Sequence, residues 1–360
     1  MKILQIIDSL GTGGAEKLLT DLVPILNQKG MIVDILLLNG ENTPFYKELI
    51  SSQTCRIFSL GSSFYNPFYI IKIMSYLKKY DIIHVHLFPA QYYAVLAKLL
   101  TYSKCKLIFT EHSTGNKRMA KWYFKGIESF IYSKYDKVVG ITQEVCDILN
   151  VKLNIPKSKI VKIENGINME KIANTLAYNR SSFNYSIDSK LLIMVAGFRE
   201  QKDQDTVIRT LLELPQTYKL LLVGDGQRRH QLESLVNKLE LGDRVNFLGV
   251  RSDVYSLIKM SDIAVLSSHW EGFGLAAAEA MACGIPVLAS NVPGLAQVVE
   301  GGGMLFEKTD ILDLAEKILK LENQQFYMQQ VKKGLEKAQT YSINQMVDKT
   351  IDLYNNICIS

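Results

Sequence analysis

Short apolar runs alternate with longer amphipathic stretches along the whole chain. Runs rich in Val, Ile and Leu without strict alternation, such as MIVDILLL (31–38) and KLLIMVAGF (190–198), are typical of strands buried on both faces. Stretches between them, such as RRHQLESLVNKLEL (228–241), carry apolar residues at helical spacing. The pattern therefore predicts parallel sheets with helices on both faces. Strands are expected over residues 2–8, 31–38, 81–88, 106–112, 137–142, 159–166, 190–198, 218–226, 244–250, 261–268, 285–290 and 302–307.

A polar stretch interrupts this alternation between about residues 168 and 190, where NTLAYNRSSFNYSIDSK shows no period, so we place the junction between domains here. A chain of 360 residues is also long for a single core. We predict an α/β protein with two Rossmann-like doubly wound domains, 1–170 and 171–340, followed by an amphipathic helix over 341–360. Two such domains facing across a cleft would bind a ligand there, at the carboxyl ends of their strands.

The composition favours a soluble globular protein, with 48% hydrophobic and 21% charged residues. The sequence contains no run of 18 or more apolar residues, so no membrane-spanning helix is expected. The N-terminus has Asp8 directly after a short apolar run, which is typical of a first core strand rather than of a secretory signal. The five cysteines are scattered and form no CxxC pair, which argues against disulfides or a zinc site. We expect a cytoplasmic protein.

The positive charge is concentrated in the first half of the chain. Residues 1–170 hold 21 Lys and Arg against 14 Asp and Glu, whereas the rest hold 20 against 22. Within this half, residues 116–137 interleave six basic residues with six aromatic ones. Such a segment can hold a protein at an anionic membrane surface, although a helix that packs its aromatics on the sheet is an equal alternative. Nucleic acid is a poorer fit, because no binding motif accompanies the charge.

The segment SSHWEGFGLAAAEAMACGIPV (267–287) carries the strongest chemical signal. Glycines around Gly272-Phe273-Gly274-Leu275 precede the helical run AAAEAMA, and backbone N–H groups at such a helix start bind anions. Glu271 stands just before this loop and Glu279 lies inside the helix. A buried carboxylate accepts hydrogen bonds from adjacent hydroxyls, as a ribose diol offers them. The alternative for an isolated pair is an ordinary helix with an exposed Glu. The glycine-rich entry and the CGIPV exit favour a site for one diphosphate flanked by two polyols.

This block resembles the signature of retaining glycosyltransferases of the GT-B fold, specifically glycosyltransferase family 4. The resemblance covers nearly the whole chain and is looser in the N-terminal half. The stretches that carry it are GTGGAEK (11–17), TEH (110–112), ENGIN (164–168), VGDGQRRHQLESL (223–235), RVNFLGVRSDV (244–254), SDIAVLSSHWEGFGLAAAEAMACGIPVLAS (261–290) and GGGMLFE (301–307).

The resemblance implies roles for the residues of this block. Glu279 would hold the donor ribose and Glu271 the transferred sugar, while the backbone at Gly274 and Leu275 would cradle the phosphate. Gly272 and Phe273 would also belong to the nucleotide-sugar site. It also implies that the first domain binds the acceptor, that the second binds the nucleotide-sugar, and that the C-terminal helix crosses back to the first domain. No residue is an obvious nucleophile, so the family's retention of configuration implies a front-face displacement.

A leaving diphosphate carries about three negative charges, which cationic side chains must stabilise if no metal does so. The resemblance assigns this role to Arg199 and Lys202 in GFREQKD. The sequence departs from the commonest family pattern here, because the Arg stands three positions before the Lys instead of five, where Gly197 lies. Lys202 is therefore the firmer assignment. Arg251, after a strand end, is expected to contact the base, with a surface arginine as the alternative.

Asp203 and Asp205 form an Asp-x-Asp that could ligate a metal. They also directly precede an apparent helix, where Asp is favoured as a cap and a dipole partner. No other cluster has the spacing of metal ligands, so we predict no metal site and no cofactor.

In the first domain, Gly13 and Gly14 precede a helix without forming GxGxxG or a P-loop, and a structural turn is as good an explanation as a ligand. The resemblance places them near the donor phosphates. His112 follows a strand, at the edge where ligands bind in doubly wound sheets. The resemblance places it beside the reacting sugar, often bonded to the 6-hydroxyl. A core histidine is the alternative, and we assign no role to His84 or His86.

The sequence thus predicts a retaining, metal-independent glycosyltransferase. It would move a hexose or N-acetylhexosamine from a nucleotide-diphosphate sugar, with UDP preferred, to a glycan or lipid-linked acceptor in the synthesis of cell-surface polysaccharide or glycoconjugate. Two alternatives are a nucleotide-sugar epimerase of the same architecture and a non-catalytic nucleotide-sugar-binding module. A dehydrogenase is disfavoured because neither domain has GxGxxG after its first strand.

Overall fold

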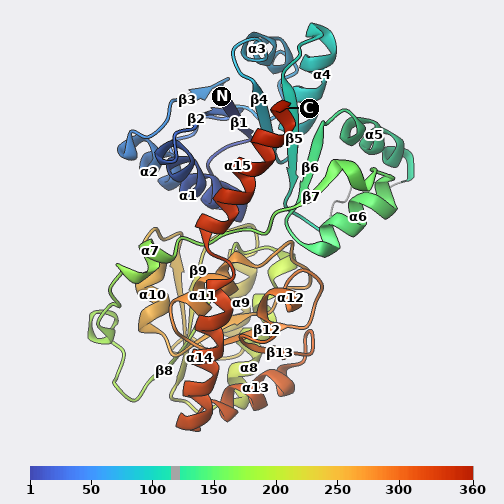
Figure 1. Cartoon of the computed structure of the whole chain (residues 1–360). Coiled ribbons are helices and arrows are strands. Elements are labelled where there is room, and N and C mark those ends of the chain that lie inside the picture. The colour runs from blue at the N-terminus through green and yellow to red at the C-terminus, as the bar shows by residue number, and fades with distance from the viewer. Residues whose placement is uncertain (115–121, 360) are drawn as a thin grey trace. The chain divides into compact units, whose positions relative to one another are not determined.

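The chain forms two units, each built on its own parallel sheet (Figure 1). The computed structural model describes residues 1–114 and 122–359. The first unit comprises residues 1–166 and 343–360, and the second comprises residues 167–342. The chain therefore crosses between the units twice, at 166/167 and at 342/343.

The first unit has a seven-stranded sheet whose strand order reverses between β1 and β4. Both β2 and β4 pair with β1 in parallel, so residues that follow β1 and β4 meet at one point of the sheet edge. Parallel strands that are buried on both faces explain the unbroken apolar runs of the sequence. In spatial order the strands are β3 (Ile57–Ser59), β2 (Ile32–Leu37), β1 (Lys2–Ile7), β4 (Ile82–His86), β5 (Lys106–Glu111), β6 (Lys137–Gly140) and β7 (Ile160–Lys162).

Helices alternate with the strands of this unit. They are α1 (Gly14–Gln28), α2 (Pro44–Ser52), α3 (Tyr69–Tyr76), α4 (Ala90–Thr101), α5 (Trp122–Ser133), α6 (Gln143–Leu153), the 3-10 turn η1 (Lys157–Lys159) and the C-terminal helix α15 (Ile343–Ile359).

The second unit has a six-stranded sheet whose order reverses between β8 and β11. The loops that follow these two strands therefore meet at the equivalent point of the second sheet. In spatial order the strands are β10 (Val245–Gly249), β9 (Tyr218–Val223), β8 (Lys190–Val195), β11 (Ile263–Leu266), β12 (Val287–Ser290) and β13 (Met304–Phe306).

Its helices are α7 (Met169–Ala173), α8 (Gln204–Thr210), α9 (Arg229–Lys238), α10 (Val254–Met260), α11 (Leu275–Ala282), α12 (Ala296–Val299), α13 (Ile311–Lys320) and α14 (Gln324–Gln339), with 3-10 turns η2 (Arg180–Phe183), η3 (Glu200–Lys202) and η4 (Leu211–Glu213).

The C-terminal helix α15 belongs to the core of the first unit. It packs beside α1, where Figure 1 draws it in red next to the blue N-terminal elements. Its apolar face, including Val347 and Tyr354, is fully buried in the same cluster as Ile3 and Leu22. The amphipathic spacing of the sequence thus corresponds to a helix that packs on β1 and α1, more than three hundred residues earlier in the chain.

The polar stretch between 174 and 190 is part of the second unit rather than a linker. The guanidinium of Arg180 donates to Asp262 at 2.8 Å and to the carbonyls of Met260 and Ser189. Tyr178 donates to Asp253. These contacts place the junction before the polar stretch, at 166/167, instead of within it.

Each of the twelve strands expected from the sequence is present, and β3 is the one that the pattern missed. It lies at the sheet edge and has only three residues, of which Ile57 and Phe58 are partly buried and Ser59 is exposed, so it shows no long apolar run. Among the described residues, no helix has the length and apolar character needed to cross a membrane.

Candidate functional site

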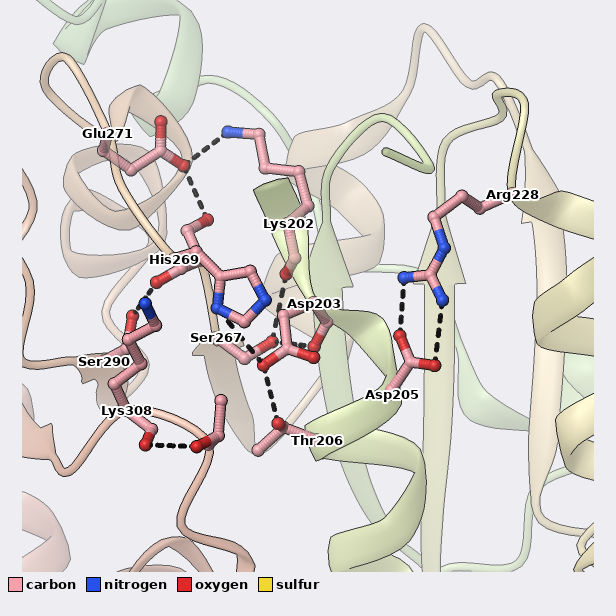
Figure 2. Close-up of polar contacts among 12 residues, drawn as sticks. Lys202, Asp203, Asp205, Thr206, Arg228, Ser267, His269, Glu271, Ser290 and Lys308 are labelled. Carbon is pink, nitrogen blue, oxygen red and sulfur yellow. Dashed lines mark hydrogen bonds and ion pairs between the residues drawn. The ribbon is translucent and has the colours of Figure 1, made fainter. Parts of the chain in front are cut away.

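Two loops are joined at the point where the strand order of the second sheet reverses. Ser267, at the end of β11, donates to the backbone carbonyl of Asp203 at 2.6 Å. The N–H of His269 donates to the carbonyl of Gln201 at 2.7 Å, and the Gln201 amide donates back to the carbonyl of Trp270 at 2.6 Å. The loop after β8 is therefore held against the loop after β11, as Figure 2 shows.

This junction brings Lys202 and Glu271 together in an ion pair, although 69 positions separate them in the sequence. Ser268 donates to the same carboxylate oxygen at 2.7 Å. The Glu271 side chain is 8% exposed and that of Lys202 is 22% exposed, so the pair sits at the boundary between core and solvent. An ammonium has three N–H donors, and Lys202 can therefore hold Glu271 and a further anion at once.

The helix α11 begins directly beside this pair. Gly274 is its N-cap and has φ +84°, a left-handed conformation that glycine adopts without strain. No side chain from the described part of the chain caps this helix. Gly274 and Leu275 are half-buried, so their N–H groups and the helix dipole are available to an anion. Gly272 is buried, and the ring of Phe273 lies in the core against Tyr341, so a ligand contact at Phe273 would use its backbone.

The two glutamates of this segment are both buried, with residue exposures of 6% for Glu271 and 5% for Glu279. The alternative of an ordinary helix with an exposed Glu is therefore wrong. Tyr255 on α10 donates to Glu279 at 2.9 Å and orients its carboxylate. A carboxylate has about four lone-pair sites, so it can accept from ligand hydroxyls as well as from a protein donor.

Gly294, in the loop after β12, holds the Glu271 loop in place and was not identified from the sequence. Its φ is +80°, and a Cβ here would lie 2.1 Å from the carbonyl oxygen of Glu271. Only glycine permits this approach of two backbones. The dipeptide Pro293-Gly294 predicts a turn after the strand. It does not indicate that this turn packs against the loop that carries Glu271.

The arginines expected near the donor differ in their surroundings. Arg199 is exposed, and no hydrogen bond or ion pair joins its side chain to another residue of the described ranges. Arg251 instead donates to Asp253 at 2.8 Å, and its side chain is 35% exposed. The guanidinium of Arg199 is therefore available to a ligand, whereas that of Arg251 is already paired with one carboxylate.

The Asp-x-Asp pair is divided between two structural roles. Asp205 accepts a bidentate hydrogen bond from Arg228, at 2.6 and 3.0 Å. Asp203 accepts from Thr206 at 2.6 Å at the start of α8, and burial raises the pKa of its carboxyl. In the part of the chain that the structure describes, no group of three or more His, Cys, Asp and Glu side chains is arranged to hold a metal ion.

In the first unit, His112 follows β5 and joins a row of histidines from β4. Its Nε2 lies 3.0 Å from Nδ1 of His86, whose ring stacks on that of His84 with centroids 4.6 Å apart. Burial lowers the pKa of His112 to about 4 and that of His84 to about 3, and it lowers the pKa of His86 well below its usual value. The three rings are therefore neutral at physiological pH.

Gly13 and Gly14 form the start of α1, also in the first unit. Gly13 is extended, with φ −86°, so its conformation does not require glycine. Because Gly13 has no side chain, the carboxylate of Glu16 can approach its backbone closely. A Cβ at this position would lie 2.3 Å from that carboxylate. The carboxylate of Glu16 thus folds back over the helix start.

Residues 115–121 of the basic and aromatic segment lie outside the described residues. Of the remainder, Tyr132 on α5 is fully buried with its ring against Phe109 of β5, which agrees with a helix packed on the sheet. Tyr135, just after α5, is also fully buried. Ile127 and Phe130 are exposed on α5, at 47% and 48%, and the Lys134 ammonium lies 4.7 Å from the Phe130 ring centroid.

The buried histidines predict acid sensitivity of the first unit. Because their folded pKa values lie below the unfolded value of about 6.5, the unfolded chain binds protons that the folded chain does not, and stability falls as the pH drops below 6.5. Each of His84 and His86 is expected to lower the free energy of unfolding by about 2 kcal/mol between pH 6.5 and 5.

Urea unfolding at pH 7.5 and 5.0 measures this loss of stability. His84→Gln should reduce the pH dependence, and replacement of the exposed His230 by Gln should not. Equal slopes in both variants contradict the prediction.

Both halves of the chain match families of known proteins. Residues 179–339 match the model of glycosyl transferases group 1, and residues 12–171 match that of glycosyltransferase family 4. An N-acetyl-alpha-D-glucosaminyl L-malate synthase of Bacillus anthracis is 30% identical over 249 residues, 67% of this chain and 65% of that protein. The chain therefore spans just under two thirds of this relative.

A second relative, and a solved structure, match over most of their lengths. The UDP-Gal:alpha-D-GlcNAc-diphosphoundecaprenol alpha-1,3-galactosyltransferase of Escherichia coli is 26% identical, over 85% of this chain and 83% of that protein. The crystal structure of Anabaena HepE in complex with UDP and glucose superposes with a TM-score of 0.87 at 20% identity, covering 99% of this chain and all of that one. At this identity the superposition establishes the fold.

Proposed function

Since the chain has the GT-B fold and its two halves match two glycosyltransferase family models, we propose that it is a glycosyltransferase that uses a nucleotide-diphosphate sugar. The donor is a UDP-sugar, and the group transferred is a hexose or an N-acetylhexosamine. The acceptor is a glycan or a lipid-linked saccharide in the synthesis of cell-surface polysaccharide or glycoconjugate. Transfer retains the anomeric configuration and needs no metal.

The observation that carries this proposal is that two buried glutamates flank the start of α11, Glu271 before it and Glu279 within the helix, and that Glu271 is paired with Lys202. The N–H groups at Gly274 and Leu275 bind the diphosphate. Glu279 accepts from the ribose hydroxyls, and Glu271 accepts from hydroxyls of the transferred sugar. Tyr255 and Ser268 hold these two carboxylates in orientation before a donor arrives.

Charge develops on the diphosphate as the bond to the sugar breaks. Lys202 and Arg199 neutralise it together with the dipole of α11. A front-face displacement, in which the leaving phosphate oxygen takes the acceptor proton, requires from the protein only orientation and charge stabilisation. Neither carboxylate is needed as a nucleophile, and both are already engaged by other side chains.

The names of the relatives support the donor and acceptor classes. One is named for UDP-galactose and a diphosphoundecaprenol acceptor, and HepE was crystallised with UDP and glucose. Work at an anionic membrane surface, through residues 116–137, is part of this proposal. A nucleotide-sugar epimerase remains the alternative, and it differs in converting the donor to an isomer with no acceptor present.

Replacing Glu279 with Gln is expected to weaken UDP binding about 10- to 100-fold, because hydrogen bonds to a charged acceptor contribute about 1.5–3 kcal/mol. The amide retains the shape of the side chain and an oxygen for Tyr255. Titration calorimetry with UDP measures the change, and a thermal-shift screen of nucleotide-diphosphate sugars identifies the donor. A donor at 100 times its Kd should add about 2.7 kcal/mol of stability.

Glu213→Gln is the matched control, since Glu213 is an exposed residue of the same unit. It should bind UDP like the wild type. Equal UDP affinity in the two variants would remove Glu279 from the site. Failure of every nucleotide-diphosphate sugar to stabilise the wild type would overturn the proposed function itself.

A further inference from the structure

A continuous chain of hydrogen bonds crosses the core of the first unit and ends at His112. It joins side chains from three neighbouring strands and from the C-terminal helix α15. Its members, in order, are Thr110, His84, Tyr354, Gln5, His86 and His112. All members before His112 are buried, and Gln5 and Tyr354 are completely so.

The orientation of the Gln5 amide determines where each proton lies. Its nitrogen donates to the Tyr354 hydroxyl at 2.9 Å, so its oxygen is left to face Nε2 of His86, also at 2.9 Å. An amide oxygen only accepts, so His86 carries its proton on Nε2. A neutral imidazole has one donor and one acceptor nitrogen, and Nδ1 of His86 is therefore an acceptor.

The same rule applies to the next ring. Nε2 of His112 lies 3.0 Å from the unprotonated Nδ1 of His86, so the hydrogen bond requires the His112 proton on Nε2. Nδ1 of His112 is then left with a lone pair. A low pKa, caused by burial, keeps the ring from gaining a second proton near neutral pH.

The other end of the chain supports this direction. Tyr354 accepts from Gln5 and so directs its own proton to Nδ1 of His84, 2.7 Å away. His84 then donates from Nε2 to the hydroxyl of Thr110 at 2.7 Å. All five hydrogen bonds point in one sense, and reversal of any one of them would require reversal of all, including a turn of the Gln5 amide.

We propose that Gln5 and Tyr354 are positioning residues that make His112 a hydrogen-bond acceptor through Nδ1. The group that His112 meets is then a hydroxyl that donates its proton, and not a phosphate oxygen, which only accepts. That this hydroxyl belongs to a sugar rests on the proposed function. The C-terminal helix α15 thus has two roles in the first unit. Its apolar face packs in the core, and the buried hydroxyl of Tyr354 acts on His112 through the chain of hydrogen bonds.

The tautomer of His112 can be measured directly in the full-length protein without any ligand. The chain has five histidines, so ¹⁵N-histidine labelling gives a small set of imidazole signals, and His112→Gln identifies those of His112. The expected wild-type spectrum has a protonated Nε2 and an unprotonated Nδ1 on His112. A protonated Nδ1 would overturn the inference, whatever the variants do.

Removing one hydroxyl tests the positioning role. Tyr354→Phe leaves the Gln5 amide without its acceptor, so we expect both tautomers of His112 to become populated and kcat/KM to fall about tenfold. Tyr135→Phe is the matched control, because this tyrosine is fully buried in the same unit and donates to the carbonyl of Gln91, outside the chain. It should leave the His112 signals unchanged and the activity within about twofold.

The outcomes separate this inference from the proposed function. If His112 shows the expected tautomer and no nucleotide-diphosphate sugar is turned over, the proton arrangement stands and the function fails. If turnover is present and Tyr354→Phe changes neither the tautomer nor kcat/KM, the positioning role fails and the function stands. If Tyr354→Phe does not fold, the wild-type spectrum alone decides.

Discussion

Replacing Lys202 with Ala is expected to lower kcat about 10²- to 10³-fold. A preorganised donor that faces a developing oxyanion contributes about 2.7–4 kcal/mol to transition-state stabilisation. Lys202 is held at the start of α11 by its ion pair with Glu271 and by the bonds of Ser267 to the loop backbone. Its ammonium is therefore in place before the diphosphate leaves. Steady-state rates with the donor identified by thermal shift measure the effect.

The affinity for UDP should change less than kcat in this variant, since the negative charge on the diphosphate grows during the reaction. Glu271 keeps its bond from Ser268, so the loop retains one of its anchors. Lys219→Ala is the control, because Lys219 lies in the same unit and its ammonium donates to the carbonyl of Asp243. A kcat for Lys202→Ala within twofold of that of this control would show that Lys202 has only a structural role.

Replacing Gly294 with Ala is expected to destabilise the second unit by about 2–4 kcal/mol and to abolish most activity. The added Cβ would lie 2.1 Å from the Glu271 carbonyl oxygen and 3.3 Å from that of Gly272. Both are backbone atoms and cannot rotate away, and the left-handed φ adds strain for any residue with a Cβ. The loop that carries Glu271 must therefore shift.

Urea unfolding gives the loss of stability, and UDP binding reports the displacement of the loop. Gly242→Ala serves as the reference, since a Cβ at Gly242 would meet no atom within 4 Å and its φ is not left-handed. That variant should stay within about 0.5 kcal/mol of the wild type. Comparable stability of the two variants would mean that the Glu271 loop accommodates the change, and the tight packing inferred here would be wrong.

Local patterns made the fold predictable from the sequence. The apolar runs located twelve strands, because a strand buried on both faces needs a continuous apolar segment whatever its neighbours are. The edge strand β3 is short and not fully buried, so it needs no continuous apolar segment, and the pattern did not identify it. The junction was expected within the polar stretch from about 168 to 190, whereas the two units divide at 166/167. The sequence did not reveal that this stretch is held to the second unit, because the side chains that hold it, such as Asp262, are distant in sequence.

The candidate site was predictable only in part. Glu271, Glu279 and the glycines between them stand within nine residues, so one local segment identified them, and the family resemblance supplied the roles that remain proposals. The resemblance also named Lys202, but its pairing with Glu271 depends on contact between two loops. Gly294 carries no chemical group, and its importance follows from the backbone atom that lies against it.

The sequence by itself determined the strand and helix segments, the doubly wound class of both sheets and the glycine-rich start of α11. Each of these features depends on residues that lie close together in the sequence. Only the tertiary structure decided which distant groups meet. Gln5 and Tyr354 are 349 positions apart, and their hydrogen bond links a first strand to a last helix. Periodicity predicts which face of an element is buried, but the proton on His112 depends on the side chains that packing brings beside it.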